Sequence, residues 1–173
     1  MILEAPQAGS DLQELLLKTF PGIAQSWSSF QGQQRVIVPA SQVLEFLMGC
    51  RDTAAFDQLI DLTCVDLLEM PGAVDRFEVV YFLLSVDVGS RLIIKTYLNE
   101  PDLTLPSATK VWFGADWLER EVYDMFGIIF EGHPNFKRLL LPEEFVSFPL
   151  RKDYPQQGRG ERHNFPVITR SQS

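Results

Sequence analysis

Three carboxylates and a histidine stand close together in the second half of the chain, at Glu119, Glu121, Asp124 and His133. Paired carboxyl groups can act as general acid and base, and a histidine beside carboxylates can bind a metal ion. One hypothesis is therefore a stand-alone hydrolase that uses these four residues. Their spacing does not favour it, because there is no HExxH or ExxH pattern, no nucleophile elbow and no Gly-rich phosphate loop. The pattern predicts neither a catalytic site nor a metal site in this chain.

The three carboxylates fall on a predicted helix over residues 116–126. Asp116 and Glu119 have the spacing of an N-terminal capping box, and Gly127 is a suitable C-terminal stop. The helix has an apolar arc of Leu118, Val122, Met125 and Phe126 and an opposite charged arc of Arg120, Glu121 and Asp124. We expect the charged arc to contact either a partner or the tail of this same chain.

The elements that must position this helix come earlier in the chain and follow no repeating strand–helix–strand pattern. Apolar periodicity and turn residues predict a helix over 10–20, strands around 23–30 and 35–38, a helix after Ser41, and strands over 56–66, 77–86 and 91–98. Locally paired strands of this kind indicate an α+β fold. We predict a single domain with a helix–two strands–helix–three strands core and a mixed sheet, followed by the helical segment and an extended tail.

Charge is distributed unevenly between the predicted domain and its tail. The chain has a formal net charge of −8, which argues against non-specific binding to nucleic acid or to an anionic membrane. Residues 1–136 hold 8 basic against 19 acidic residues, whereas residues 137–173 hold 7 against 4. Proline and glycine also become frequent beyond Pro142, and such a segment cannot bury enough apolar surface to fold alone. We therefore predict a domain over residues 1–141 and an extended basic tail over 142–173 that lies across a partner.

The two cysteines, Cys50 and Cys64, lie in apolar stretches and form no CxxC pair. They are expected to be buried thiols in a reducing compartment, with no framework for zinc or an iron–sulfur cluster. No run approaches the roughly 18 apolar residues that cross a bilayer, and the N-terminus lacks the pattern of a signal peptide. If the protein works at a membrane, a partner must hold it there.

The segment from Glu119 to Pro155 resembles the signature of the C-type subunit family of respiratory complex I, which includes the mitochondrial thirty-kilodalton subunit. Its charged and polar positions in this chain are Glu119, Arg120, Glu121, Asp124, His133, Lys137, Arg138, Arg151, Lys152, Asp153 and Tyr154. Between them run Gly127-Ile-Ile-Phe-Glu-Gly-His-Pro134 and Phe148-Pro-Leu-Arg-Lys-Asp-Tyr-Pro155. The resemblance has no departure across this segment.

The resemblance implies a cofactor-free scaffold subunit on the peripheral arm of NADH:quinone oxidoreductase, which couples electron transfer from NADH to quinone with proton translocation. It implies contact with the large subunit that holds the quinone site and with iron–sulfur subunits, while flavin and the clusters belong to those partners. It further implies a peripheral location at the cytoplasmic face of the bacterial inner membrane. The equivalent subunit of a membrane-bound hydrogenase or a ferredoxin-linked complex remains an alternative. The identity of the neighbouring genes would distinguish these complexes from NADH:quinone oxidoreductase.

The tail segment between Pro149 and Pro155 offers two cations and an aromatic on a path that the prolines hold extended. We hypothesise that Arg151 and Lys152, with Asp153, pin the tail to the quinone-site subunit. Replacing both cations by alanine is then expected to weaken assembly while leaving the melting temperature of the isolated domain almost unchanged.

Overall fold

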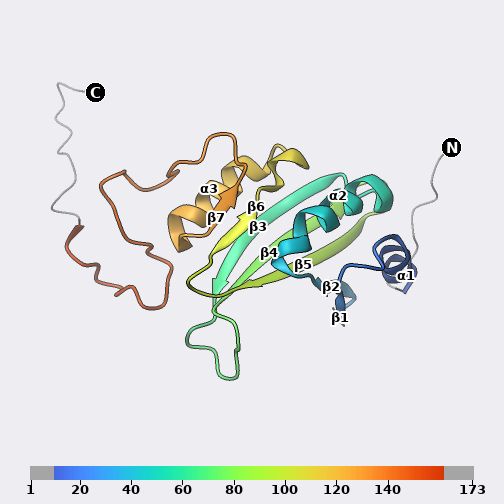
Figure 1. Ribbon diagram of the computed structural model, residues 1–173, viewed down its shortest axis with the longest axis horizontal. Helices are drawn as coiled ribbons and strands as arrows, with labels where there is room; N and C mark the ends of the chain where they lie inside the picture. The colour runs from blue at the N-terminus through green and yellow to red at the C-terminus, as the bar shows by residue number, and fades with distance from the viewer. Residues whose placement is uncertain (1–9, 162–173) are drawn as a thin grey trace.

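The computed structural model describes residues 10–161, and the order of its elements agrees with the predicted one (Figure 1). The elements are α1 (Ser10–Thr19), β1 (Ser26–Phe30), β2 (Gln33–Ile37), η1 (Ala40–Gln42), α2 (Val43–Ala54), β3 (Gln58–Asp66), β4 (Phe77–Ser85), β5 (Ser90–Leu98), β6 (Thr104–Pro106), η2 (Ala108–Lys110), α3 (Ala115–Phe126) and β7 (Ile129–Glu131), where η marks a 3₁₀ helix. The helix–two strands–helix–three strands core and the α+β class are confirmed.

Five strands form one sheet in the order β1-β2-β5-β4-β3. Only β2 and β5 are parallel to each other, while the other neighbouring pairs are antiparallel, so the predicted mixed sheet is confirmed. A parallel pair needs a crossover connection, and the chain from β2 to β5 supplies it through α2 and the β3–β4 hairpin. The sheet therefore joins a local N-terminal hairpin to a three-stranded meander.

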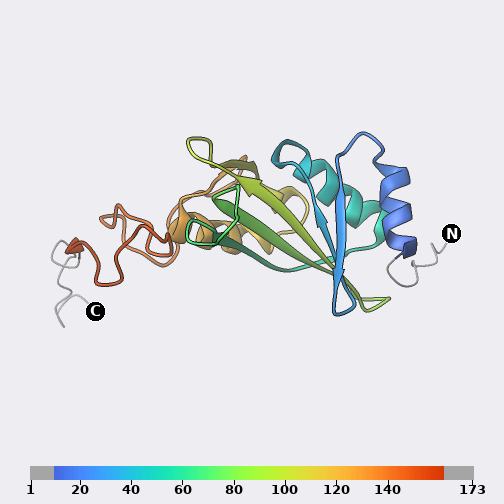
Figure 2. The same ribbon diagram turned by 90° about the horizontal axis from the view of Figure 1, so that it is seen from below.

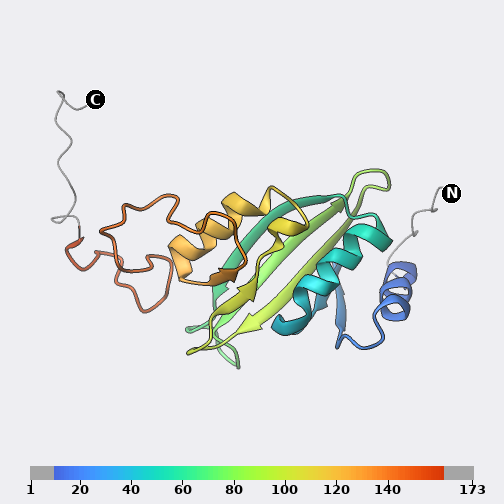
Figure 3. The same cartoon turned by 45° about the horizontal axis from the view of Figure 1, so that its top comes forward.

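The core lies between one face of this sheet and the helices α2 and α3, which both lie over that face (Figure 3). Phe46 of α2 and Tyr81 of β4 are each fully buried there, and Val122, from the apolar arc of α3, packs into the same core. Seen from below, α1 packs beside α2 near the N-terminal end of the molecule (Figure 2). Cys50 and Cys64 are buried in the same core, as expected from their apolar neighbours.

Two strands were not predicted: β6 and β7, which pair in parallel as a small second sheet. Each has only three residues, which is too short for an alternating pattern to be recognised. After β7, residues 132–160 form turns and extended chain without a helix or strand. Residues 137–161 are called the C-terminal lobe below. The predicted domain boundary after residue 141 stays a prediction.

Between residues 10 and 161, no helix is long and apolar enough to cross a membrane.

Candidate partner interface at helix α3 and the C-terminal lobe

Asp124 on α3 is fully buried and binds the start of the C-terminal lobe. Its carboxylate accepts hydrogen bonds from Nη1 of Arg138 at 2.6 Å and from the backbone N–H groups of Leu139, Leu140 and Leu141 at 3.1, 2.7 and 2.8 Å. Burial acts to raise the pKa of Asp124, but these four donors outweigh it and leave the pKa below its usual value. The charged arc of α3 thus contacts the same chain at residues 138–141, directly before the tail predicted over 142–173.

Arg120 belongs to the same contact and is only 7% exposed. Its guanidinium donates to the backbone carbonyls of Lys137 (3.0 Å) and Arg138 (3.3 Å), and it lies over the ring of Trp117 at 5.1 Å. Arg120 therefore binds backbone carbonyl groups of residues 137 and 138, while Asp124 binds the backbone N–H groups of residues 139–141. Of the charged arc, only Glu121 is exposed.

Glu119 does not act as the predicted capping-box residue. Helix α3 begins after Gly114 without a side-chain cap, whereas the Glu119 carboxyl accepts from Ser107 Oγ at 2.7 Å and from the N–H of Ala108 at 2.6 Å. It satisfies the start of η2 instead of the start of its own helix, because β6 and η2 bring that turn against the buried side of α3. Burial raises the pKa of Glu119 to about 7, although the two hydrogen bonds oppose the shift.

This buried carboxyl gives a pH-dependent contribution to stability. A glutamate whose folded pKa is raised binds its proton more tightly in the folded state, so its contribution is fully present below its ordinary pKa of about 4.3 and is lost as the pH rises through about 7. We expect Glu119→Gln to fold with both hydrogen bonds and to remove this pH dependence. Urea unfolding at pH 5 and pH 8 should show the wild type losing stability relative to Glu119→Gln, with the exposed Glu121→Gln as control. Parallel pH profiles for wild type and Glu119→Gln would contradict this.

His133 fixes a turn and shares no site with the three carboxylates of the hydrolase hypothesis. Its side chain is fully buried, with Nε2 3.1 Å from the carbonyl oxygen of Asp116 and Nδ1 3.1 Å from the N–H of Asn135. Since Nδ1 accepts from Asn135, Nε2 carries the proton and donates to Asp116. Between residues 10 and 161, no three His, Cys, Asp or Glu side chains are grouped to hold a metal ion. The geometry gives the hydrolase hypothesis no support.

Arg151 fastens the lobe to the end of α3. Its guanidinium donates to the carbonyl of Phe126 and to Glu100 (3.0 Å), and it lies over the rings of Phe77 and Phe148 at 5.2 and 4.7 Å. Gly127, predicted to end the helix, does so with φ +81°. A Cβ there would come within 2.7 Å of Arg151 Nη2, so this position needs glycine both for its backbone and for its space.

The residues after Arg151 bind the ends of β3 and β4. The N–H of Lys152 donates to Asp66 at 2.8 Å, and Asp153 forms an ion pair with Arg76 at 2.8 Å that lowers the pKa of its carboxyl. Arg76 also pairs with Glu100 at 2.8 Å, so one network joins β3, β4, the loop after β5 and the lobe. The roles of Asp66, Arg76 and Glu100 were not predicted, because nothing local marks them as partners of a segment far along the chain.

These contacts change the expectation for the tail segment. Arg151 and Asp153, which were expected to pin the tail to a partner, bind their own domain, so replacing Arg151 is no longer expected to leave the melting temperature unchanged. Tyr154 likewise donates to Glu161 within the lobe, at 3.0 Å. The side chains of Lys137 and Lys152 are exposed and make no ion pair with the described residues. That the segment contacts the quinone-site subunit stays a prediction, and Lys152 is its available cation.

Large apolar side chains are exposed around the same helix and lobe. They are Phe113 (94% exposed), Val146 (77%), Trp117 (62%), Leu140 (62%) and Leu150 (52%). Single exposed apolar residues are ordinary, but two aromatics four residues apart at the start of α3 are of the kind enriched at protein interfaces. No function was predicted for Phe113 or Trp117 from the sequence. Two aromatic residues at the start of an amphipathic helix, outside its apolar arc, could have indicated a binding surface.

Comparison with known proteins gives consistent results. Residues 36–160 match the family described as respiratory-chain NADH dehydrogenase, 30 Kd subunit. The C-type subunit of NADH-quinone oxidoreductase from Citrifermentans bemidjiense is 45% identical, over 76% of this chain and 80% of that protein, and its counterpart from Rhodopseudomonas palustris is 41% identical, over 85% and 71%. A solved trypsin-resistant fragment (1-134) of Nqo5 is 36% identical with a TM-score of 0.62, covering 72% of this chain and 98% of the fragment. An archaeal membrane-bound sulfane sulfur reductase, at 24% identity, TM-score 0.74 and 94% coverage of both chains, shares the fold.

Another relative, from Candida albicans, carries the name iron-sulfur protein 3 of a mitochondrial NADH dehydrogenase and is 39% identical over 84% of this chain and 52% of its own length. Between residues 10 and 161 the side chains do not fit a cluster, because both cysteines are buried in the core and no three His, Cys, Asp or Glu side chains are grouped to hold a metal ion. Burial raises the pKa of the Cys64 thiol to about 12, which disfavours the thiolate. The family match extends over α2, the three strands β3, β4 and β5, α3 and nearly all of the lobe. With the bacterial relatives it shows that this chain belongs to the family of the 30-kDa subunit of respiratory-chain NADH dehydrogenase, also known as complex I.

Proposed function

We propose that this chain is a cofactor-free, non-catalytic scaffold subunit of NADH:quinone oxidoreductase that supports the quinone-site subunit together with neighbouring iron–sulfur subunits. Electrons pass from NADH to quinone through flavin and clusters held by those partners. The chain meets NADH and quinone only through the complex, and the complex holds it peripherally at the cytoplasmic face of a bacterial inner membrane.

The observation that carries this proposal is that the signature residues hold the chain's own structure together. Glu119, Arg120, Asp124, His133 and Arg151 each bind the chain's own backbone. Residues engaged in this way stiffen a surface and have no free group for acid–base chemistry. Exposed apolar side chains surround this stiffened part, as a partner-binding surface requires. A rigid surface of this kind supports a scaffold role, because cofactors and a quinone headgroup in neighbouring subunits must be held to narrow tolerances.

Phe113 gives the most direct test of the proposed surface. It is almost fully exposed, so Phe113→Ser is expected to leave the unfolding free energy of the full chain within about 0.5 kcal/mol of wild type. Loss of a binding hot spot, a class rich in aromatic residues, costs about 2 kcal/mol or more of binding, so less of the variant should be retained in the complex. The measurement is the amount of tagged chain that co-purifies with the NADH:quinone oxidoreductase from membranes of a complemented deletion strain.

Val86→Ser is the matched control, since Val86 is half exposed in the turn between β4 and β5, away from the lobe. Retention of wild type and Val86→Ser with reduced retention of Phe113→Ser supports the proposed surface. The scaffold role itself fails if the wild-type chain does not purify with a complex that oxidises NADH, or if the purified chain alone catalyses a redox reaction.

A further inference from the structure

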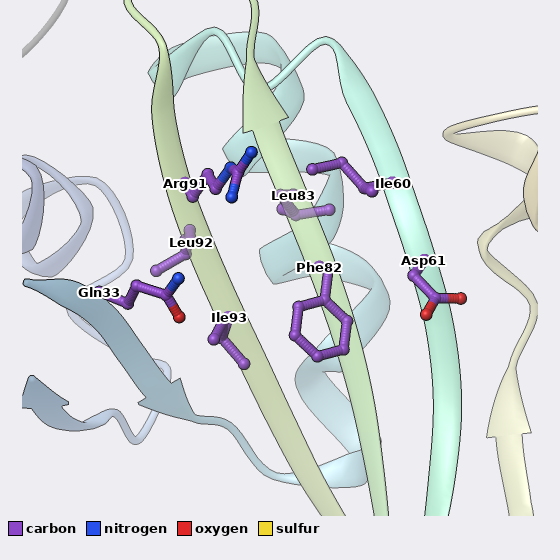
Figure 4. A pocket seen from close by; sticks show the side chains of 8 residues that line it. All are labelled: Gln33, Ile60, Asp61, Phe82, Leu83, Arg91, Leu92 and Ile93. Carbon is purple, nitrogen blue, oxygen red and sulfur yellow. The ribbon is translucent and has the colours of Figure 1, made fainter. Parts of the chain in front are cut away.

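The face of the sheet opposite α2 and α3 is not covered by any helix or strand between residues 10 and 161, and it carries a hollow of about 310 Å³ (Figure 4). Phe82 of β4 and Ile93 of β5, which are directly paired, form the apolar floor. Ile60 extends this floor at the point where the register between β3 and β4 shifts. Ile93 is only 8% exposed, so the floor lies below a rim of longer side chains.

Two opposite charges stand on either side of this floor, Arg91 on β5 and Asp61 on β3, with β4 between them (Figure 4). Both are exposed, and neither forms an ion pair with a described residue. Among the described residues, the Asp61 carboxylate accepts only the N–H of Leu62, at 2.8 Å. Arg91 and Asp61 therefore remain available to charges from outside the chain.

Elsewhere on the same face, opposite charges within reach of each other are paired. Lys95 lies 2.7 Å from Glu78, which also accepts from the hydroxyl of Tyr97 at 2.7 Å. Lys95 and Glu78 therefore neutralise each other, and that part of the face needs no charge from a partner. The two unpaired charges, Arg91 and Asp61, thus lie at the hollow. A partner that binds there needs opposite charges at the same spacing.

We propose that the hollow docks a helix of a partner subunit that carries a carboxylate and a cation two turns apart with an apolar side chain between them. Neighbouring strands lie about 4.8 Å apart, so β5 and β3 are separated by about 10 Å across β4. Asp61 pairs with Phe82 and Arg91 with Leu84, so the two charges are also offset by two residues, about 7 Å, along the strands, and they stand roughly 12 Å apart on a diagonal. Residues seven apart on a helix are separated by about 10.5 Å along its axis, which is close to that span. A helix lying diagonally across the strands can therefore place its carboxylate at Arg91, its cation at Asp61 and its apolar residue on the floor. The proposal rests on the proposed function, since that supplies the partner subunit.

A second copy of this chain fits the hollow less well. Two copies could pair Arg91 with Asp61 reciprocally, as an isologous dimer does. Their recessed floors would then face each other across the two rims, and no side chain would fill the space between them. A convex helix with a projecting apolar side chain fills that space.

Charge reversal distinguishes these occupants. We expect Arg91→Glu and Asp61→Lys each to lower the amount of chain retained in the purified membrane complex at least tenfold, because like charges would then face each other across the interface. The double variant Asp61→Arg/Arg91→Asp should be retained no better than either single variant, since the partner's charges are unchanged. Glu45→Lys, an exposed reversal on α2, is the control and should be retained as wild type.

Melting temperatures of all the full-length variants should stay close to that of wild type, because neither charge forms an ion pair with any residue between 10 and 161. Wild-type retention of both single variants would overturn the docking proposal, while reduced retention of Phe113→Ser in the same strain would leave the scaffold function standing. Light scattering of the purified chain gives the other opposing result. A dimer that the single reversals break and the double reversal restores would show that a second copy occupies the hollow.

Discussion

Replacing Asp124 by alanine is expected to lower the free energy of unfolding by about 3–5 kcal/mol, the usual cost of removing one partner from a buried ion pair. Asp124 is fully buried, and its loss leaves Arg138 and the N–H groups of residues 139–141 without their acceptor. Urea unfolding of the full chain near neutral pH measures the effect. Glu121→Ala, on the exposed side of α3, should change the stability by less than about 0.5 kcal/mol.

The pH dependence of the Asp124 effect follows from its lowered pKa. A carboxylate with a depressed folded pKa contributes stability that is present above its ordinary pKa of about 3.9 and is lost as the pH falls through the folded value. The difference between wild type and Asp124→Ala should therefore be constant around neutral pH and shrink in acid below about pH 4. A difference that stays constant into strong acid would mean that the carboxylate charge contributes nothing.

Arg151→Ala is expected to destabilise the attachment of the lobe by about 2–3 kcal/mol, because it removes charge-assisted hydrogen bonds to Phe126 and Glu100 and the stacking on two aromatic rings. The expected result is a lower unfolding free energy together with faster limited proteolysis after Lys152, which lies beside the loosened contact. Arg151→Lys keeps the charge but not the planar fork, so it should recover less than half of the loss.

Lys152→Ala is the matched control for Arg151→Ala. Its side chain is exposed, and the residue binds Asp66 through its backbone N–H, which alanine retains. Its stability should stay within about 0.5 kcal/mol of wild type. Equal melting temperatures for Arg151→Ala and wild type would mean that the lobe is fastened without Arg151, and the expectation that both cations face the quinone-site subunit would then be restored.

The element order, the mixed sheet and the helix ending at Gly127 could be predicted, because periodicity and turn residues are local signals. The role of Glu119 could not, since the spacing Asp116–Glu119 looks the same whether the carboxyl caps its own helix or reaches Ser107 on another element. The charged arc of α3 was expected to contact a partner or the tail, but the sequence could not say which residues it would bind. Its partners lie on an irregular segment after β7, and irregular segments leave no periodic pattern.

The charges of the tail were harder to interpret for a related reason. Its basic composition suggested a surface for a partner, yet Arg138 and Arg151 are mostly buried against carboxylates of the same chain. Counting charges along a sequence cannot show which of them neutralise each other after folding. What composition did identify was a segment that cannot fold by itself, and the structure shows that the domain supplies its support.

The hydrogen bond from the Lys152 N–H to Asp66 also bears on the order in which the chain folds during synthesis. The two residues are 86 positions apart, so at a synthesis rate of about 5–20 residues per second Asp66 is made roughly 4–17 s before Lys152. In the folded protein the Asp66 carboxylate also lies 3.6 Å from Arg76 and accepts the N–H of Leu68, and both of these residues are made well before Lys152. The β3–β4 hairpin can therefore form early around its own ion pair, and the lobe is the last described part of the newborn chain to be fixed in place.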